Sequence, residues 1–276
     1  MRDEDFENLA HLEDTFWWFA GMRQVQAALL DPVVEQARPF LRPEAERVIL
    51  DLGCGTGGNL TWLRRYGAAA SIGGLDVVEQ ALRFCQSRGD RNVVLASATH
   101  LPYADESCDI ATSFDVLVQI PGDGGDDLAM TEMYRVLRPG GVAFARGAAY
   151  GWMHSGHDVA LHTQRRYTLR EISNLAERAG FEVVRRTYAN SVLFPVAAVR
   201  RLVLMRIGAA ASDSDVKPMP RGLRWTNRLL TSALRLEARV LSQPRARLPF
   251  GLSTNVVLRK PAASGAGHTA GRAVSP

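Results

Sequence analysis

A glycine-rich loop after a short apolar run constrains the fold of this chain more than any other feature. Residues 47–52 read Arg-Val-Ile-Leu-Asp-Leu, a composition typical of a buried parallel strand. Residues 53–58 read Gly-Cys-Gly-Thr-Gly-Gly and lead into a helical pattern. Such a turn lets a ligand approach the backbone, and the following helix N-terminus offers free N–H donors. The loop therefore predicts a ligand-binding strand–turn–helix unit.

Strands and helices are expected to alternate along the rest of the chain. The expected strands are 71–76, 92–96, 108–118, 142–149, 181–188 and 251–260, and the expected helices between them are 78–88, 126–137 and 168–179. Thr168 and Glu171 form a capping-box pattern at the start of the last of these helices. The alternation predicts an α/β fold with a doubly wound, mostly parallel sheet.

The same pattern divides the chain into segments. We expect an N-terminal helical lid at 1–46, an α/β core at 47–190, a helical insertion at 191–250, the last strand of the core at 251–260 and a disordered tail at 261–276. The insertion is interpreted as a lid or an oligomer contact. Its second helix, near 225–241, is amphipathic, with one stripe formed by Trp225, Leu229, Ala233, Leu236 and Val240.

Charge is distributed unevenly along the sequence. The chain has 33 Lys/Arg and 29 Asp/Glu, a net charge of +4. Residues 191–276 hold 14 basic and 3 acidic side chains, a net of +11, whereas residues 1–190 hold 19 and 26, a net of −7. An anionic substrate, a membrane surface or a nucleic acid could use the basic part, although an Arg-rich composition accounts for it equally well. No secretory signal is recognised and the three cysteines form no C-x-x-C pair, so a cytoplasmic protein without disulfides is expected.

The ligand of the glycine loop is not settled by the loop alone. Gly53, Gly55 and Gly58 satisfy the dinucleotide fingerprint G-x-G-x-x-G. Asp51, however, precedes the first glycine by two residues, and an acid there suits a cationic group better than a pyrophosphate. Asp76, at the end of the second expected strand, can accept hydrogen bonds from both hydroxyls of a ribose.

Four motifs make the chain similar to one family. They are Val-Ile-Leu-Asp-Leu-Gly-Cys-Gly-Thr-Gly at 48–57, Gly-Leu-Asp at 74–76, Ala-Thr-His-Leu-Pro-Tyr at 98–103 and Val-Leu-Arg-Pro-Gly-Gly at 136–141. Together they resemble the class I S-adenosylmethionine-dependent methyltransferases over about residues 47–150. The resemblance implies a Rossmann-like seven-stranded sheet, mostly parallel with one reversed strand, here 252–260.

The resemblance also implies a cofactor and its ligands. The cofactor is S-adenosyl-L-methionine, with S-adenosyl-L-homocysteine as product. The implied cofactor-binding residues are Asp51, Gly53, Gly55, Gly57, Asp76, Val77, Ala98, Thr99, Asp115 and Arg23. The chain departs from the family at Ser97, where many members carry an acid that binds the adenine amino group.

The acceptor side is expected in the segment after the fifth strand. Three of the six histidines lie there, and the run from His157 to Thr168 resembles a subgroup of bacterial small-molecule methyltransferases. We expect His157, His162 and His154, in that order, as candidates for a catalytic base. The alternative is that they pack a loop or cap a helix. The candidate substrate-binding residues are Trp17, Gln119, Arg166 and Tyr167, and no metal site is expected.

The predicted function is methyl transfer to a small or amphipathic metabolite at O, N or C, in a biosynthetic role. The alternative is an RNA or protein methyltransferase that uses the basic C-terminal third, and a non-catalytic cofactor-binding module is a further alternative. Expected partners are a small amphipathic or anionic acceptor, peripheral contact with an anionic membrane and a second copy of the chain. No nucleic acid is expected, because no nucleic-acid-binding module is recognised.

Overall fold

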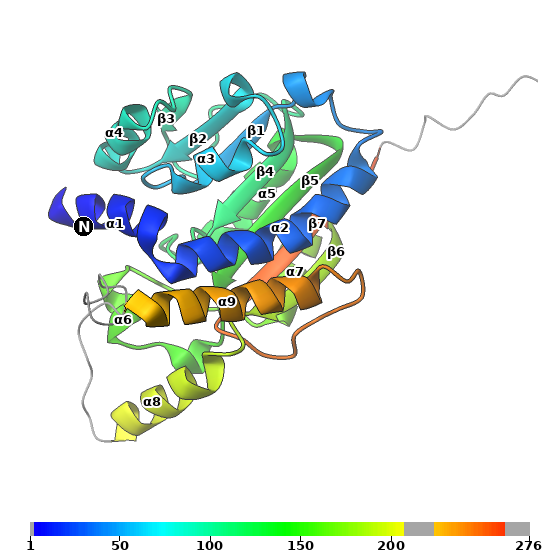
Figure 1. Ribbon diagram of the computed structural model, residues 1–276. Coiled ribbons are helices and arrows are strands. Elements are labelled where there is room, and N and C mark those ends of the chain that lie inside the picture. The colour runs from blue at the N-terminus through cyan, green and yellow to red at the C-terminus, as the bar shows by residue number, and fades with distance from the viewer. Residues whose placement is uncertain (1–2, 207–223, 263–276) are drawn as a thin grey trace, which may run out of the picture.

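A seven-stranded sheet runs through the computed structural model, which describes residues 3–206 and 224–262 (Figure 1). The strand order is β3-β2-β1-β4-β5-β7-β6. The strands are β1 (Ile49–Leu52), β2 (Ile72–Asp76), β3 (Val93–Leu95), β4 (Cys108–Phe114), β5 (Leu137–Ala148), β6 (Glu182–Ala189) and β7 (Ser253–Arg259). β7 runs antiparallel to both of its neighbours, β5 and β6, and all other neighbouring strands are parallel. The predicted Rossmann-like sheet with one reversed strand is confirmed.

Helices cover both faces of this sheet, and further helices lie outside that layer. The helices are α1 (Asp3–Thr15), α2 (Trp17–Ala37), α3 (Gly58–Leu63), α4 (Glu79–Ser87), α5 (Gly125–Val136), α6 (Gly156–Ala160), α7 (Leu169–Arg178), α8 (Phe194–Arg206) and α9 (Arg224–Leu241). The capping box at the start of α7 is present as predicted, since Thr168 accepts from the Glu171 N–H and Glu171 accepts from the Thr168 N–H. α9 lies alongside α2 (Figure 1).

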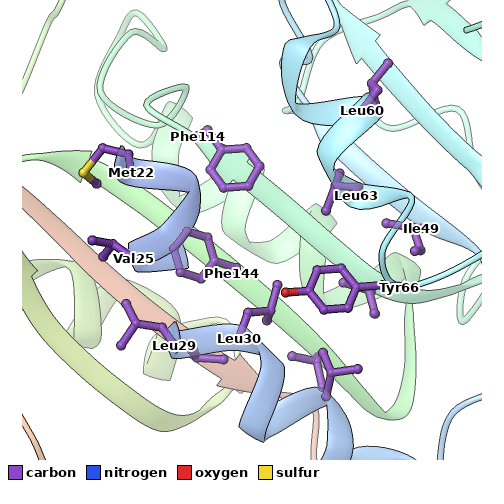
Figure 2. Packing of buried hydrophobic residues seen from close by; sticks show 14 of the residues in the cluster. Met22, Val25, Leu29, Leu30, Ile49, Leu60, Leu63, Tyr66, Phe114 and Phe144 are labelled. Carbon is purple, nitrogen blue, oxygen red and sulfur yellow. The ribbon is translucent and has the colours of Figure 1, made fainter. Parts of the chain in front are cut away.

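Two apolar clusters hold the layers together, one on each face. Successive strand residues point to opposite faces, so Ile49 joins one cluster and Leu50 the other. Figure 2 shows the first cluster, in which Leu30 of α2 lies beside Phe144 of β5, and Leu63 of α3 belongs to the same cluster. The second cluster lies under α5 and α7. With its sheet buried on both faces, the molecule fits the expectation for a doubly wound fold.

The fifth strand begins earlier than the sequence indicates. The run Pro139-Gly140-Gly141 looks like a helix stop before a strand at 142, but β5 already begins at Leu137. Leu137 pairs with Cys108 across an irregular register, and the Gly140 N–H donates to the Lys260 carbonyl at 2.9 Å. Pairing on both sides therefore extends the strand through a Pro-Gly sequence. The predicted disordered tail lies largely outside the described residues.

Candidate functional site

The glycine loop lies where the strand order of the sheet reverses, between β1 and β4. In open α/β sheets this is the place at which the carboxyl ends of the strands leave a crevice for a ligand. Gly53, Gly55 and Gly57 have φ values of 71°, 54° and 89°, a region that favours glycine. A Cβ atom on Gly53 would lie 2.2 Å from a methyl carbon of Val116, so no side chain fits there. The loop brings bare backbone to the crevice.

Asp51 supplies a buried carboxylate beneath this loop. Its Oδ1 accepts a 2.7 Å hydrogen bond from the Thr112 hydroxyl of β4, whereas its Oδ2 is buried without a partner. Burial raises the pKa of Asp51 to about 8. A cationic group that reached Oδ2 would satisfy this oxygen and favour the ionised form.

Arg23 of α2 and Glu13 of α1 lie close to Gly58, at the C-terminal end of the glycine loop. A Cβ atom on Gly58 would lie 2.6 Å from Glu13 Oε2 and 2.7 Å from Arg23 Nη2. Glu13 Oε2 accepts from the Thr56 hydroxyl at 2.5 Å and from the Gly58 N–H at 3.0 Å. Arg23 Nε and Nη2 are buried without a hydrogen-bond partner, and burial lowers the pKa of this guanidinium. An anionic group here would compensate Arg23.

Asp76 ends β2 on the other side of the loop. Its two carboxylate oxygens accept 3.0 Å hydrogen bonds from the N–H groups of Gly55 and Val78. Each oxygen keeps a further lone pair for a hydroxyl donor. The neighbouring Val77 is 68% exposed and offers an apolar surface for a flat ring. This corner therefore combines hydroxyl acceptors with an apolar platform.

Asp115 and Arg146 form an ion pair at the carboxyl ends of β4 and β5. Asp115, with a φ of 61°, accepts from Arg146 Nε at 2.9 Å and from Nη2 at 2.6 Å. The buried guanidinium of Arg146 also lies 4.7 Å from the ring centroid of Trp18 and 5.4 Å from that of Phe114. Charge and aromatic surface thus adjoin the glycine loop on its β5 side.

Comparisons with known proteins identify this arrangement. A family model described as a methyltransferase domain matches residues 50–145, which contain the glycine loop, Asp76 and Asp115. The methyltransferase GfsG of Streptomyces halstedii is 33% identical over 185 residues, 57% of this chain and 63% of that protein. Residues 50–145 thus match a methyltransferase domain, and the chain is similar to S-adenosylmethionine-dependent methyltransferases.

Two further relatives carry different acceptors in their names. A fatty-acid O-methyltransferase of Mycolicibacterium smegmatis is 35% identical over 36% of this chain and 35% of its own length. A tRNA (carboxymethyluridine(34)-5-O)-methyltransferase of Arabidopsis thaliana is 34% identical over 42% of this chain and 27% of its own length. The chain thus spans less than two thirds of each of these relatives. Similarity to this methyltransferase family does not fix the acceptor.

The predicted cofactor residues lie around the glycine loop. Arg23, Asp51, Asp76 and Asp115 come from α2 and from the ends of three strands, as described above. Ala98 is buried in the second apolar cluster, which also contains Leu75 of β2. The Thr99 hydroxyl lies 2.8 Å from the Ser97 hydroxyl, the position where the family often has an acid. Their roles toward the cofactor stay predictions.

The predicted catalytic histidines lie on the segment after β5. His154 and His162 are exposed, and His154 Nε2 lies 3.2 Å from the Thr163 carbonyl oxygen. His157 lies in α6, but its side chain is outside the part of the chain that the structure describes. The neighbouring Asp158 accepts from Arg166 Nε at 2.7 Å and from the Ser155 N–H at 2.8 Å. Asp158 is therefore engaged with partners other than an imidazole, and the base stays a prediction.

Three of the four predicted substrate-binding residues have side chains that bind or pack against other parts of the protein. Arg166 also donates to the Ala149 carbonyl at 2.8 Å, and the Tyr167 hydroxyl donates to Asp126 at 2.7 Å. Trp17 is buried in the core beside Phe16, and Gln119 is exposed in the turn after β4. Their assignment to acceptor binding stays a prediction. Trp18, rather than Trp17, packs its ring against the guanidinium of Arg146.

Glu13 and Arg146 are the charged residues of this candidate site that the sequence did not predict. Glu13 lies far from the glycine loop in sequence, and Arg146 is one arginine in a strand of ordinary composition. A usable signal for Arg146 is that a charged residue in a buried parallel strand needs a partner. Glu13 has no such signal, because an acid on a polar helix is usually solvated.

Replacing Glu13 by Ala is expected to destabilise the protein by about 1–3 kcal/mol, because the Gly58 N–H and the Thr56 hydroxyl lose their buried acceptor. Urea unfolding followed by circular dichroism measures the free-energy difference. Glu7→Ala on the same helix is the matched control, since Glu7 is exposed. Equal stability of the two variants would contradict the assigned contact.

Proposed function

We propose that this protein transfers the methyl group of S-adenosylmethionine to a small or amphipathic metabolite. The observation that carries the proposal is a pair of buried groups lacking partners beside one glycine loop. Asp51 Oδ2 lacks a hydrogen-bond donor, and Arg23 Nε and Nη2 lack hydrogen-bond acceptors. The amino-acid end of the cofactor carries one ammonium and one carboxylate, so it supplies both. The residues present therefore fit this cofactor.

The nucleoside part fits the corner at the end of β2. Asp76 would accept from the two ribose hydroxyls with the lone pairs left by Gly55 and Val78. Val77 would pack on the adenine face, and Ala98 and Thr99 would bracket its edge. Bound in this way, the cofactor supplies an electrophilic methyl group on a cationic sulfur.

The residues of the chain then act mainly by positioning the acceptor. Alignment of a nucleophile with the methyl group provides a large part of the rate enhancement in such a displacement. Trp18 and Phe114 flank the Arg146–Asp115 pair at the edge where the acceptor would enter. Beyond β5, an aromatic cluster is formed by Tyr150, Trp152, Tyr188, Phe194 and Phe250. These rings favour an acceptor with a large apolar part.

A direct assay tests the proposal and its main alternative. The protein is incubated with S-adenosylmethionine labelled in the methyl group, together with either a panel of fatty acids, phenols and amines or total RNA. Label in a small molecule supports the proposal. Label in RNA, with activity that falls steeply as salt rises, would establish the alternative that the tRNA-modifying relative suggests. Label in neither would contradict methyl transfer to these acceptors.

His157 is proposed as the base that removes a proton from the acceptor. Replacing it by Ala is expected to lower kcat by about a hundredfold, the usual contribution of a general base. His11→Ala is the control, because His11 is an exposed histidine of α1. His154→Ala and His162→Ala show whether another histidine of the segment takes the role. An unchanged kcat in the His157 variant removes it from the mechanism.

A further inference from the structure

The inner side of α9 is fixed firmly to the rest of the protein. Leu234 approaches Gly21 of α2 so closely that a Cβ atom there would lie 2.4 Å from Leu234 Cδ1. The buried carboxylate of Glu237 accepts from the N–H groups of Asn190 at 2.8 Å and Val192 at 3.0 Å. Asn227 accepts from the Trp17 N–H at 2.7 Å. These contacts set the rotation of α9 about its own axis and so decide which residues face outward.

The outer side of α9 carries a long apolar stripe. Trp225, Leu229, Leu236 and Val240 are 62%, 59%, 60% and 45% exposed. Their spacing of four, seven and four residues places them on one line along the helix. The amphipathic stripe expected from the sequence thus points away from the core. A row of four large exposed apolar side chains is typical of an interaction surface.

Three arginines lie beside this stripe. Arg228, Arg235 and Arg239 are exposed, and within the described residues none of their guanidinium groups has a hydrogen-bond or ion-pair partner. Glu237 is the single acidic residue of α9, and it is turned inward. The outer face is therefore apolar along one line and positive along the next, without a negative charge of its own.

We propose that this outer face of α9 binds the surface of an anionic lipid bilayer. Leucine, valine and tryptophan side chains beside arginines match the interfacial zone, where acyl chains meet acidic headgroups. A nucleic acid would use the arginines but leave the apolar line exposed. A second copy packed symmetrically would bring like charges together. Within the described residues no helix is long and apolar enough to cross a membrane, so α9 lies along the surface.

Vesicle flotation tests this proposal without any assay of methyl transfer. The full chain is expected to float with vesicles of phosphatidylglycerol and phosphatidylcholine at low salt, and not with phosphatidylcholine alone. A variant with Arg228, Arg235 and Arg239 all changed to Gln should bind about a hundredfold more weakly, because each arginine near an anionic surface contributes about 1 kcal/mol. Trp225→Ser with Leu236→Ser should also reduce binding.

Two control variants outside α9 test whether any loss of an exposed apolar or basic residue reduces vesicle binding. Leu128→Ser on α5 and Arg170→Gln on α7 remove one exposed apolar and one exposed basic residue away from α9, and both should float like the original chain. Thermal unfolding of each α9 variant must give a transition like that of the original chain, so that a loss of binding is not a loss of folding. Absence of flotation with anionic vesicles at low salt overturns the proposal. It is also overturned if the α9 variants float normally, or if they instead abolish a dimer or RNA binding.

Discussion

Replacing Asp76 by Ala is expected to weaken binding of S-adenosylhomocysteine by at least about a hundredfold. A hydrogen bond to a charged group contributes about 1.5–3 kcal/mol, and this carboxylate would accept two from the ribose. The same loss is expected for 5′-methylthioadenosine, because it keeps the ribose and lacks the amino-acid part. Isothermal titration calorimetry with the two ligands measures the effect.

Two further variants separate ribose binding from the local structure. Asp76 also holds the Gly55 N–H, so thermal unfolding must show that the glycine loop survives the substitution. Glu79→Gln is the matched control, since Glu79 is an exposed acid three positions on that pairs with Arg83. If Asp76→Ala binds both ligands as tightly as the original chain, the ribose site lies elsewhere.

The sheet and the glycine loop could be predicted because local sequence determines them. A short, mostly apolar run that leads into a glycine turn, such as residues 47–52, is typical of a strand covered on both faces. Gly53 and Gly57 are required by a backbone with positive φ, which few other residues adopt. The run 139–141 shows the limit, because a Pro-Gly-Gly sequence became part of β5 once neighbouring strands paired with it.

The charged partners of the site could not be predicted, because they depend on contacts between distant segments. Glu13 meets Thr56 only once α1 lies across the start of α3. Trp17 and Trp18 are adjacent in sequence and equally aromatic, yet the direction of α2 buries the first and turns the second over Arg146. Similarly, Arg166 precedes Tyr167 in the sequence as a candidate to bind substrate. In the structure, however, its guanidinium donates to Asp158.

Helix α9 shows the same limit for an amphipathic pattern. Periodicity identifies the line of Trp225, Leu229, Leu236 and Val240 correctly, but it does not say which side of the helix is buried. The second apolar line, with Leu234 and Leu241, is the one that packs on α2. Gly21 favours the line that contains Leu234, because the absence of a side chain at Gly21 leaves space for Leu234 against α2.

The free energy of unfolding is expected to respond to pH through Asp51. Burial raises its pKa from 3.8 to about 8, so the folded chain binds a proton more strongly than the unfolded chain. This contribution to stability is complete below the unfolded pKa and is lost as pH rises toward 8. Without ligand, the midpoint of thermal unfolding should therefore fall between pH 5 and pH 8 relative to Asp51→Asn.

Cofactor binding should reverse that trend, since an ammonium near Asp51 Oδ2 favours the ionised carboxylate. The affinity for S-adenosylhomocysteine should then increase as pH rises toward 8, by up to about tenfold for each pH unit below the pKa of Asp51. 5′-Methylthioadenosine, which has no ammonium, should show no such growth, and neither should Asp51→Asn with either ligand. Calorimetry across this pH range measures all four combinations. Parallel pH profiles for the two ligands on the original chain would mean that the ammonium binds elsewhere, and the unpaired oxygen of Asp51 would then need another partner.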